Sequence, residues 1–530
     1  MSVTYVCGRN FDLGNADSTE ITARFEVQGT REAGELLLPA AIDAGTPRKT
    51  RLTTVTPGAV TVSVGGVVAG SADNSGAECP PPNPAPPEPQ ATVGEWSTPF
   101  PWPVVAVHLH LLPDGRVLSW GRMGQPQIWD PATGGFSEAP SATDLFCSGH
   151  TFLSDGRLLV AGGHIDQDRG LPDANLFDVS SSSWMPLPPM AHGRWYPTVT
   201  ELADGRVLAI AGRNQSGAES SVPEIWDGVS WSPLTSADRV LPYYPRTFLA
   251  PNGKVFYAGE LPQSSYLDPQ SGTWEAVAQT LYGRREYGSA VMFRPGQVLI
   301  VGGSDPPGGP PTSSAEVIDL AETSPAWRFT GSMAAARRQF NATLLPDGRV
   351  VATGGTSAAG FTDPAGAVHA AEVWDPSSGQ WTTWASNAVT RVYHSTTLLL
   401  PDGRLLHAGS GDGAYLPREL SAELFSPPYL FRGARPRIEA APSAVTYTER
   451  FEVETGDAGT IVQVSLVRLS AVTHAFDQSQ RYVPLAFTRS AGGLTVIAPA
   501  SSSVAPAGHY MLFALNGDGV PSLSRVMQFH

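Results

Sequence analysis

The chain has 530 residues, enough for roughly two to four domains, and it carries a net charge of −15 without any basic cluster. This balance argues against nucleic acid and anionic membrane surfaces as partners, and no apolar run approaches the roughly 20 residues of a membrane-spanning helix. Charged residues make up only 16% of the chain, whereas 55 residues are glycine and 48 are proline. That composition is typical of many short strands joined by turns.

Residues 1–78 alternate apolar and polar positions, as in ITARFEVQG and GAVTVSVGGVV, which predicts an N-terminal β-sandwich. Residues 79–94 begin with CPPPNPAPPEPQ and form a proline-rich linker. Cys7 and Cys79 bracket the sandwich, and we expect a disulfide that stabilises it by about 4 kcal/mol; two unrelated free thiols are the alternative. The first residues lack the pattern of a signal peptide. We therefore expect a mature form in an oxidising location: extracellular, cell-surface or periplasmic.

Residues 95–428 contain a turn signal that recurs seven times, at intervals of 41 to 55 residues. After most turns comes an apolar strand ending in a small pair such as Gly162-Gly163, and then an apolar-Asp strand such as IWDP. Seven units of four short strands predict a seven-bladed β-propeller that resembles the kelch type. Residues 429–530 leave the repeat and predict a C-terminal Ig-like β-sandwich, so that the whole chain is expected to be all-β. The turns are Asp114-Gly115-Arg116, Asp155-Gly156-Arg157, Asp204-Gly205-Arg206, Asn252-Gly253-Lys254, Pro295-Gly296-Gln297, Asp347-Gly348-Arg349 and Asp402-Gly403-Arg404.

Aligning the blades on these turns places one residue of each blade in a ring around the propeller axis. The position eight residues before the turn Asp, or before its substitute, holds a thiol, three phenols, an amide and an imidazole in six of the blades. Inward-facing blade positions normally carry small aliphatic side chains, so this ring indicates a functional site at the axis. Its members are Ala106, Cys147, Tyr196, Tyr244, Tyr287, Gln339 and His394.

Each candidate residue also has a structural interpretation. Cys147 by itself is most simply a small, inert, buried hydrophobe, and Tyr196 a buried structural tyrosine. Tyr393 and His394 are adjacent, and neighbours on a regular strand face opposite sides. Both therefore reach one point only if they lie where the chain enters the strand. His474, on a predicted hairpin loop, matters only if the C-terminal domain reaches the axis. Two imidazoles and two phenolates suit Cu(II) better than zinc, and a divalent metal must help to remove the phenol proton.

Four separated motifs carry a resemblance to a known family: LFCSGH, RWYP, RVYHSTTLLLPDGR and THAFDQSQR. Over about residues 95–530 the chain resembles the copper radical oxidases, the family of galactose oxidase and glyoxal oxidase. The resemblance implies a thioether between Cys147 and Tyr196, which together form a radical cofactor made from the chain itself. It also implies that Tyr196, His394 and His474 ligate one copper ion. Tyr393 is implied to be the axial ligand and to take the hydroxyl proton of the substrate.

The chemistry implied by the resemblance follows from electron counting. Oxidation of an alcohol or an aldehyde hydrate releases two electrons; copper takes one of them and the Tyr196 radical takes the other with a hydrogen atom. Dioxygen then reoxidises the site and leaves as hydrogen peroxide, in a ping-pong cycle. The expected partners are thus a small substrate and O2, with a peroxidase as a possible user of the peroxide and the chain acting as a monomer.

The motif GRWYP is nearer to the glyoxal oxidase branch of the family. In the galactose-oxidising branch, a tryptophan that stacks on the Tyr–Cys pair follows the glycine pair, but AIAGRNQSG has Arg213 and Asn214 there. We therefore expect small aldehydes, as hydrates, or primary alcohols as substrates, rather than galactose. The predicted pocket residues, from the ring alignment and AAARRQF, are Tyr244, Tyr287, Arg337, Arg338 and Gln339. For the two arginines the alternative is that they tie blades together through ion pairs.

Two other classes of function compete with the oxidase. A catalytically silent kelch propeller that binds glycan or protein is the main alternative, because the fold alone does not decide function. The enzyme is favoured because a binding module has no need for the five residues of the site, which are Cys147, Tyr196, Tyr393, His394 and His474. A zinc or calcium hydrolase is disfavoured, because the sequence lacks an acidic cluster and a general-base carboxylate. Further histidines near the blade starts are interpreted as supporting or structural: His108, His110, His150, His164 and His192.

Overall fold

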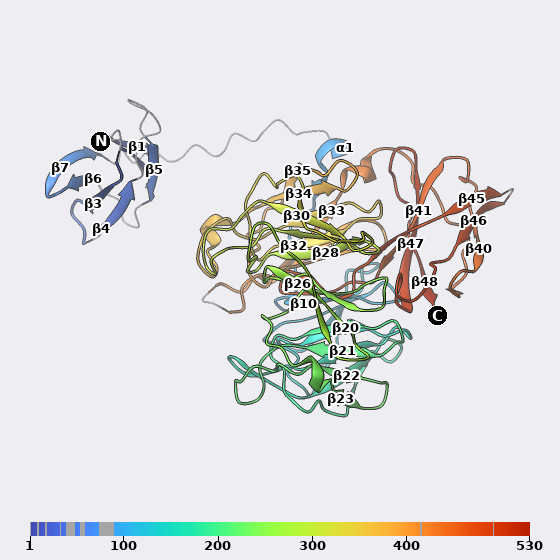
Figure 1. Ribbon diagram of the computed structural model, residues 1–530. Coiled ribbons are helices and arrows are strands. Elements are labelled where there is room, and N and C mark those ends of the chain that lie inside the picture. Colours follow the sequence, from blue (N-terminus) through green and yellow to red (C-terminus); the bar gives the residue numbers. More distant parts are fainter. Residues whose placement is uncertain are drawn as a thin grey trace. The chain divides into compact units, whose positions relative to one another are not determined.

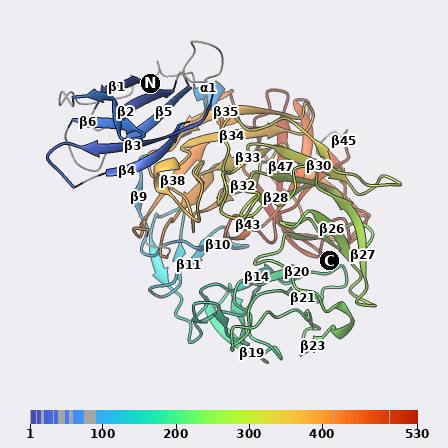
Figure 2. The same ribbon diagram turned by 60° about the vertical axis from the view of Figure 1, so that its left-hand side comes forward.

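The computed structural model describes residues 2–7, 10–15, 19–31, 33–38, 48–53, 59–73, 90–413, 416–490 and 492–530. The chain divides into two compact units, Met1–Glu88 and Pro89–His530. Its regular structure is almost entirely β-strand (Figures 1 and 2), apart from the single turn of helix α1 (Gln90–Val93) and three short 3₁₀ turns in the described residues. No helix in these ranges is long and apolar enough to cross a membrane. The fold is therefore all-β, as the composition predicts.

The first unit contains two antiparallel sheets. Alternating side chains from both sheets are buried and form one apolar core that includes Phe11, Leu13, Val27 and Val60. The side chain of Cys7 and the whole of Cys79 lie outside the described residues, so the predicted disulfide stays a prediction. The sheets are β1 (Ser2–Cys7), β2 (Asn10–Asn15) and β5 (Arg48–Thr53), and, in spatial order, β4 (Ala33–Leu38), β3 (Ile21–Val27), β6 (Val60–Val64) and β7 (Val67–Ala72).

The second unit contains seven antiparallel sheets that follow one another along the chain. The first two sheets are β10 (His108–Leu111), β11 (Val117–Trp120), β12 (Gln127–Trp129) and β13 (Phe136–Glu138), and then β14 (Gly149–Phe152), β15 (Leu158–Ala161), β18 (Ala174–Asp178) and β19 (Ser183–Leu187). The third, fourth and fifth sheets are β20 (Thr198–Glu201), β21 (Val207–Ile210), β22 (Glu224–Trp226) and β23 (Trp231–Pro233); β24 (Thr247–Leu249), β25 (Val255–Tyr257), β26 (Gln263–Leu267) and β27 (Trp274–Gln279); and β28 (Ser289–Arg294), β29 (Gln297–Val301), β30 (Ala315–Asp319) and β31 (Arg328–Phe329). The sixth sheet is β32 (Asn341–Leu344), β33 (Val350–Thr353), β34 (Ala370–Asp375) and β35 (Gln380–Ser386), and the seventh contains β36 (Thr396–Leu399), β37 (Leu405–Ala408) and β38 (Ser421–Ser426). A small hairpin, β16 (His164–Asp166) and β17 (Arg169–Gly170), follows β15.

The seventh sheet is completed by the start of the same unit. Strand β38 pairs with β8 (Glu95–Trp96) and also with β9 (Phe100–Pro101), which precede the first sheet in sequence. Strand β36 of this sheet packs against β10 of the first sheet. The two ends of the repeated region are therefore held together by backbone hydrogen bonds.

Four of the sheets contain a buried arginine–glutamate pair that the sequence analysis did not detect. In each pair the arginine lies two or three residues before the ring position, and the glutamate lies on the third strand of the same sheet. The guanidinium also donates to backbone carbonyls, and the carboxylate accepts backbone N–H groups, so each ion has several hydrogen-bond partners, although Nε of Arg194, Arg285 and Arg337 has none. Each pair thereby fixes the segment that presents a candidate site residue. The pairs are Arg194–Glu224, Arg285–Glu316, Arg337–Glu372 and Arg391–Glu423.

Glu372→Gln is expected to lower the free energy of unfolding by about 3–5 kcal/mol, because it leaves the Arg337 guanidinium buried without a counter-charge. Both side chains are at most 1% exposed. The measurement is the denaturant midpoint of the second unit. Glu322→Gln is the control, because Glu322 pairs with Arg328 on the exposed surface and should hardly move the midpoint. Equal midpoints for the two variants would contradict a stabilising role of the buried pair.

The C-terminal part of the second unit forms two further antiparallel sheets around their own apolar core. In Figure 1 these orange and red strands gather at one side of the unit. In spatial order the first sheet is β39 (Ala444–Val445), β48 (Arg525–Phe529), β47 (Gly508–Asn516), β41 (Ile461–Arg468) and β44 (Tyr482–Leu485), with only the β39–β48 pair parallel. The second is β40 (Arg450–Glu454), β46 (Gly493–Ile497) and β45 (Phe487–Ser490).

Between β41 and β44 a hairpin leaves these two sheets. It inserts among the strands that come first in each of the seven repeated sheets. It consists of β42 (Ala471–Thr473) and β43 (Phe476–Asp477), and β42 adds to β10 with Thr473 opposite His108. The hairpin and the residues after it also bond to β14 and β20 through Gln478, to β24 through Arg481, to β28 through the Ala475 carbonyl and to β32 through Gln480. The C-terminal region is thus anchored at the place where the first strands converge.

Candidate functional site

The residues of the predicted ring share one unusual backbone conformation. Six of the seven have a positive φ, which non-glycine residues rarely adopt and which costs roughly 1–2 kcal/mol. Each lies two or three residues before the first strand of its sheet, so the same turn recurs at the entry to six strands. The φ values are 63° for Cys147, 67° for Tyr196, 45° for Tyr244, 54° for Tyr287, 56° for Gln339 and 69° for His394.

Backbone hydrogen bonds join these turns to one another. The Tyr196 N–H donates to the Cys147 carbonyl, and the Tyr244 N–H donates to the Tyr196 carbonyl, both at 2.9 Å. The Gln339 N–H donates to the Tyr287 carbonyl at the same distance. The alignment on turn signals therefore identified positions that are equivalent in space, and hydrogen bonds between sheets hold several of them in place.

The left-handed turn places consecutive side chains on the same side of the chain. The rings of Tyr393 and His394 stack with centroids 3.8 Å apart, although residues on a regular strand face opposite ways. This agrees with the expectation that both residues lie where the chain enters strand β36. Trp195 and Tyr196 repeat the arrangement, with centroids 3.8 Å apart and ring planes within 9°. Trp195 is thus the aromatic side chain that covers Tyr196, a role to which sequence reasoning assigned no residue.

Two phenols and two imidazoles meet at one buried point. The hydroxyl oxygens of Tyr196 and Tyr393 are 2.5 Å apart. The ring centroid of His474 lies 4.5 Å from that of Tyr196 and 4.6 Å from that of His394. His474 occupies the turn between β42 and β43, so the C-terminal region does reach the other candidates. All four side chains are at most 5% exposed.

The imidazoles are held in the tautomer that a metal ligand needs. Nδ1 of His394 lies 2.5 Å from the Gly411 carbonyl, which can only accept, so the proton sits on Nδ1. The Thr473 hydroxyl donates to the Val107 carbonyl and accepts from Nδ1 of His474. In both rings the lone pair is therefore on Nε2, and each Nε2 is buried without a hydrogen-bond partner.

These two orphaned nitrogens and the two phenol oxygens form a donor set that fits copper. Mixed imidazole and phenolate ligands suit Cu(II), and the described residues contain no group of three or more His, Cys, Asp or Glu side chains placed to hold a metal. Burial lowers the pKa of His394 to about 3 and keeps the His474 pKa well below its usual value. Burial raises the pKa of Tyr196 and Tyr393 well above 10. The imidazoles are thus neutral and ready to bind, whereas both phenols keep their protons unless a cation is present.

Cys147 belongs to the same buried cluster as Trp195, Tyr196 and Tyr244. Its side chain is fully enclosed, and burial raises the pKa of the thiol well above its usual value. The backbone bond from Tyr196 to Cys147 keeps the two residues side by side. Trp195 is fixed in turn because its indole N–H donates to Nδ1 of His164 at 3.2 Å. His164 is one of the histidines predicted to have a supporting or structural role.

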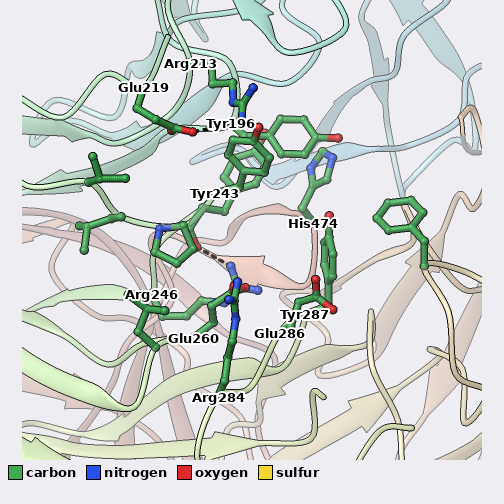
Figure 3. A pocket seen from close by; sticks show the side chains of 16 residues that line it. Tyr196, Arg213, Glu219, Tyr243, Arg246, Glu260, Arg284, Glu286, Tyr287 and His474 are labelled. Carbon is green, nitrogen blue, oxygen red and sulfur yellow. Dashed lines mark hydrogen bonds and ion pairs between the residues drawn. The ribbon is translucent and has the colours of Figure 1, made fainter. Parts of the chain in front are cut away.

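Two cavities open beside Tyr196. The first, of about 460 Å³, also reaches His474 and Tyr244 (Figure 3). The second, of about 540 Å³, is bordered by Trp195, Tyr393 and His394. The cavities share Tyr196, Tyr243, Tyr287 and Phe361 as common walls. Either volume accommodates a small molecule next to the phenol pair.

The first cavity is lined by charged residues, most of which are paired. Arg213 forms an ion pair with Glu219, and Arg284 forms one with Glu260 (Figure 3). Arg246 donates to the carbonyls of Tyr244 and Gly288 and has no carboxylate partner among the ion pairs of the described residues. Arg213, in the stretch where the galactose-oxidising branch is expected to carry a tryptophan, lies in the wall of this cavity. Sequence reasoning missed Tyr243, Arg246 and Phe361, which come from segments between strands.

The predicted pocket residues divide into two groups. Tyr244 and Tyr287 line the first cavity, and Tyr287 also lines the second. Arg337, Arg338 and Gln339 line neither of the two. Arg337 is enclosed by its pair with Glu372 in its own sheet. Arg338 pairs with Glu286 at 2.6 Å and lies over the Tyr287 ring, so it ties two neighbouring sheets together. The amide of Gln339 donates to the Phe361 carbonyl.

Comparison with known proteins identifies the family. The model of the glyoxal oxidase N-terminus matches residues 310–429, and that of the galactose oxidase-like early set domain matches residues 435–529. Galactose oxidase of Gibberella zeae is 30% identical over 490 residues, which cover 83% of this chain and 71% of that protein. The chain belongs to the copper radical oxidase family. It is accordingly an oxidoreductase.

Other copper radical oxidases and related proteins support the same assignment. Aldehyde oxidase GLOX of Vitis pseudoreticulata is 29% identical, over 79% of this chain and 88% of that protein. A fungal alcohol oxidase of the AA5 family, solved in complex with copper, superimposes with a TM-score of 0.76 at 26% identity. That structure covers 83% of this chain and is itself covered completely. The silent binding propeller considered from the sequence thus gives way to the oxidase.

Proposed function

We propose that this copper radical oxidase oxidises small aldehydes, as their hydrates, or primary alcohols with O2 and releases H2O2. The proposal rests on one observation above all: two buried imidazole nitrogens without partners converge with two phenols beside a cysteine. A silent binding surface has no use for this set. Similarity to a galactose oxidase, an aldehyde oxidase and an alcohol oxidase supports the substrate class. The small cavities favour small molecules.

In this proposal each residue of the site has a distinct task. Tyr196, Tyr393, His394 and His474 hold one copper ion, which when bound supplies a one-electron couple and lowers the pKa of the phenols. Cys147 is joined to the Tyr196 ring by a thioether, which makes the phenol easier to oxidise. Tyr393 takes the hydroxyl proton of the substrate, and the oxidised Tyr196–Cys147 unit takes a hydrogen atom from carbon. Overall, the substrate gives two electrons and two protons to O2.

Trp195 and the cavity walls support this chemistry. Trp195 covers one face of the Tyr196 ring and so shields an oxidised phenol from solvent and from side reactions. Burial of the whole cluster keeps the two phenols and two imidazoles rigid, because each is held by neighbouring backbone or side-chain groups. Tyr244 and Tyr287 form the wall next to the reacting oxygens. Tyr243, Arg246 and Phe361 join them as candidate substrate contacts.

We also propose the finer architecture that the repeat predicts. The seven sheets form a kelch-type seven-bladed propeller over residues 95–428, closed by the pairing of β38 with β8. Residues 1–78 and 429–530 form β-sandwiches, and the second of them supplies His474 to the centre. A monomer outside the cytoplasm, with a peroxidase using the H2O2, completes the proposal.

The proposal is tested by a peptide mass map after aerobic copper loading and full reduction. We expect the Cys147 and Tyr196 peptides in one species, two hydrogens lighter than their sum. A thiol titration of the denatured, reduced protein should lose one of the three cysteines of the chain. The same protein kept free of copper and oxygen is the control and should show two separate peptides. Separate peptides in copper-loaded, oxygen-exposed protein would contradict the Tyr–Cys cofactor. That result would favour the alternative of a catalytically silent propeller that binds glycan or protein.

A further inference from the structure

A group of three buried histidines lies next to Cys147 and has no part in the proposed catalytic cycle. His108 and His110 stand on β10, and both rings stack on Trp120 of the neighbouring strand, at 4.9 and 4.4 Å with planes within 13°. His150 lies on β14, and its ring meets both of the others edge-on. All three side chains are 0% exposed. Buried polar rings at this density call for a physical reason.

His108 differs from the other two because it bonds to the cysteine segment at two points. Its Nε2 accepts the backbone N–H of Cys147 at 3.2 Å. Its Nδ1 lies 3.0 Å from Nε2 of His150, three residues further along the same segment. Since an amide can only donate, Nε2 is the accepting nitrogen and the proton of the neutral ring is on Nδ1, which donates to His150. The His108 imidazole is therefore hydrogen-bonded to both ends of the segment 147–150.

The hydrogen bond from Cys147 to His108 constrains a residue whose backbone conformation is strained. Cys147 has a φ of 63°. Glycine would adopt this φ without strain, but glycine has no thiol for the proposed thioether. The Cys147 carbonyl accepts the N–H of Tyr196, so both polar groups of the cysteine backbone are committed: one to His108 and one to the tyrosine it faces. Two hydrogen bonds therefore hold the Cys147 backbone beside Tyr196, within the buried cluster that contains both side chains.

We propose that His108 is a positioning residue for the reaction that joins Cys147 to Tyr196. The inference rests on the thioether of the proposed function and extends it to the residue that prepares the unmodified chain. The reaction breaks the S–H bond of Cys147 and one ring C–H bond of Tyr196 beside its hydroxyl, and it forms one S–C bond. Two electrons and two protons pass to O2, which becomes H2O2. His108 takes no proton in this step; it limits the conformations of Cys147 before the bond exists.

His110 serves as the control for His108. Because the His108 ring also meets the ring of His474 edge-on, with centroids 5.9 Å apart, the two variants are compared at Cu(II) concentrations that saturate both. His110 stands two residues away on the same strand, stacks on the same indole and is equally buried, but its Nδ1 bonds only to the Leu118 carbonyl. Replacement of either histidine by phenylalanine removes one buried imidazole and keeps the stack on Trp120. Only His108→Phe removes the acceptor of the Cys147 N–H.

The experiment starts from copper-free, reduced full-length protein and follows the cross-link by mass after addition of Cu(II) in air. We expect His108→Phe to form it about tenfold more slowly than the wild type, and His110→Phe at a rate close to that of the wild type. Amide hydrogen exchange at Cys147 before copper addition should be faster in His108→Phe alone. Turnover per cross-linked molecule should fall much less than the cross-linking rate, because the covalent bond then holds Cys147.

Each outcome decides between distinct interpretations. Equal slowing in both phenylalanine variants would overturn the proposal, since it would reveal a general packing effect, and so would unchanged cross-linking in His108→Phe. If His108→Phe does not fold, His108→Leu and His110→Leu replace the pair, because leucine also lacks an acceptor, and cross-linking must still slow in the first alone. A wild-type chain that never cross-links would overturn the proposed function and this inference together. Normal wild-type cross-linking with equal variants would overturn the inference only.

Discussion

Cys147→Ser is expected to retain the fold and copper binding but to lose turnover by at least about a hundredfold. Serine fits the space of the thiol but forms no thioether, so Tyr196 remains an ordinary phenol that is harder to oxidise. A rise of only about 120 mV in a one-electron potential lowers the oxidised fraction about a hundredfold. The measurement is the rate of H2O2 release with the best small aldehyde or alcohol, normalised to bound copper.

The variant carries its own controls. None of the four proposed copper ligands is changed, so the copper content per chain should match that of the wild type. The thermal transition should move little, because the serine stays within the hydrogen bonds of the Cys147 backbone. Wild-type-like turnover with full copper would rule out the thioether as a catalytic element. Loss of copper together with turnover would instead assign Cys147 a structural role.

Tyr393→Phe is expected to form the Cys147–Tyr196 cross-link but to lower kcat/KM by roughly a hundredfold or more. The phenylalanine has no oxygen to take the substrate proton, and a positioned general base typically contributes 10²–10⁴-fold. It also removes the 2.5 Å hydrogen bond with Tyr196. Steady-state kinetics with the best substrate, beside a mass measurement of the cross-link, separates the two effects.

The cross-link is the internal control for this variant, because it reports that Tyr196 and Cys147 still meet. An unchanged kcat/KM in cross-linked Tyr393→Phe would remove the assigned role of Tyr393. If the variant also fails to cross-link, Tyr393 has an earlier function in preparing the site. A substrate that is already deprotonated in solution should recover part of the lost rate, since it needs no base.

The sequence was sufficient to locate the ring of candidate site residues because each repeated sheet marks its own position with a turn. Counting back from the Asp-Gly-Arg signals found Cys147, Tyr196 and His394 without any structure. The count succeeds because strands of nearly equal length follow equivalent turns. A sequence without repeats would not have supplied this internal reference.

Trp195 shows where reasoning from the sequence ends. The rule of alternating side chains places it opposite Tyr196, and that rule assumes an extended backbone. The φ of 67° at Tyr196 breaks the alternation, and nothing in the residue type of a tyrosine announces a positive φ. Alternation therefore points away from Trp195, the residue adjacent to Tyr196, and leaves only a position after the glycine pair for an aromatic cover.

Arg337 illustrates a different limit. The alignment placed it close to the axis, and its charge suggested contact with a substrate. Its partner, Glu372, begins the motif EVWD, and the same glutamate precedes the apolar pair in EIWD, EVID and ELFS. Arginine before the ring position and glutamate on the third strand recur together in four of the repeated sheets, so the pairing was detectable from the sequence as a second repeated signal. Tyr243, Arg246 and Phe361 carried no such signal, since tertiary packing alone sets the path of their segments.

Under the proposed ligand set, the position of the His474 hairpin late in the chain has a consequence for the order in which the site forms during synthesis. Tyr196 and Tyr393 are 197 residues apart in the chain, and His474 emerges from the ribosome about 4–16 seconds after Tyr393 at about 5–20 residues per second. Until the hairpin inserts beside β10, a nascent chain presents only part of the donor set. If the proposed ligand set holds copper, oxidative chemistry therefore cannot begin before the C-terminal hairpin has been made and has paired with β10.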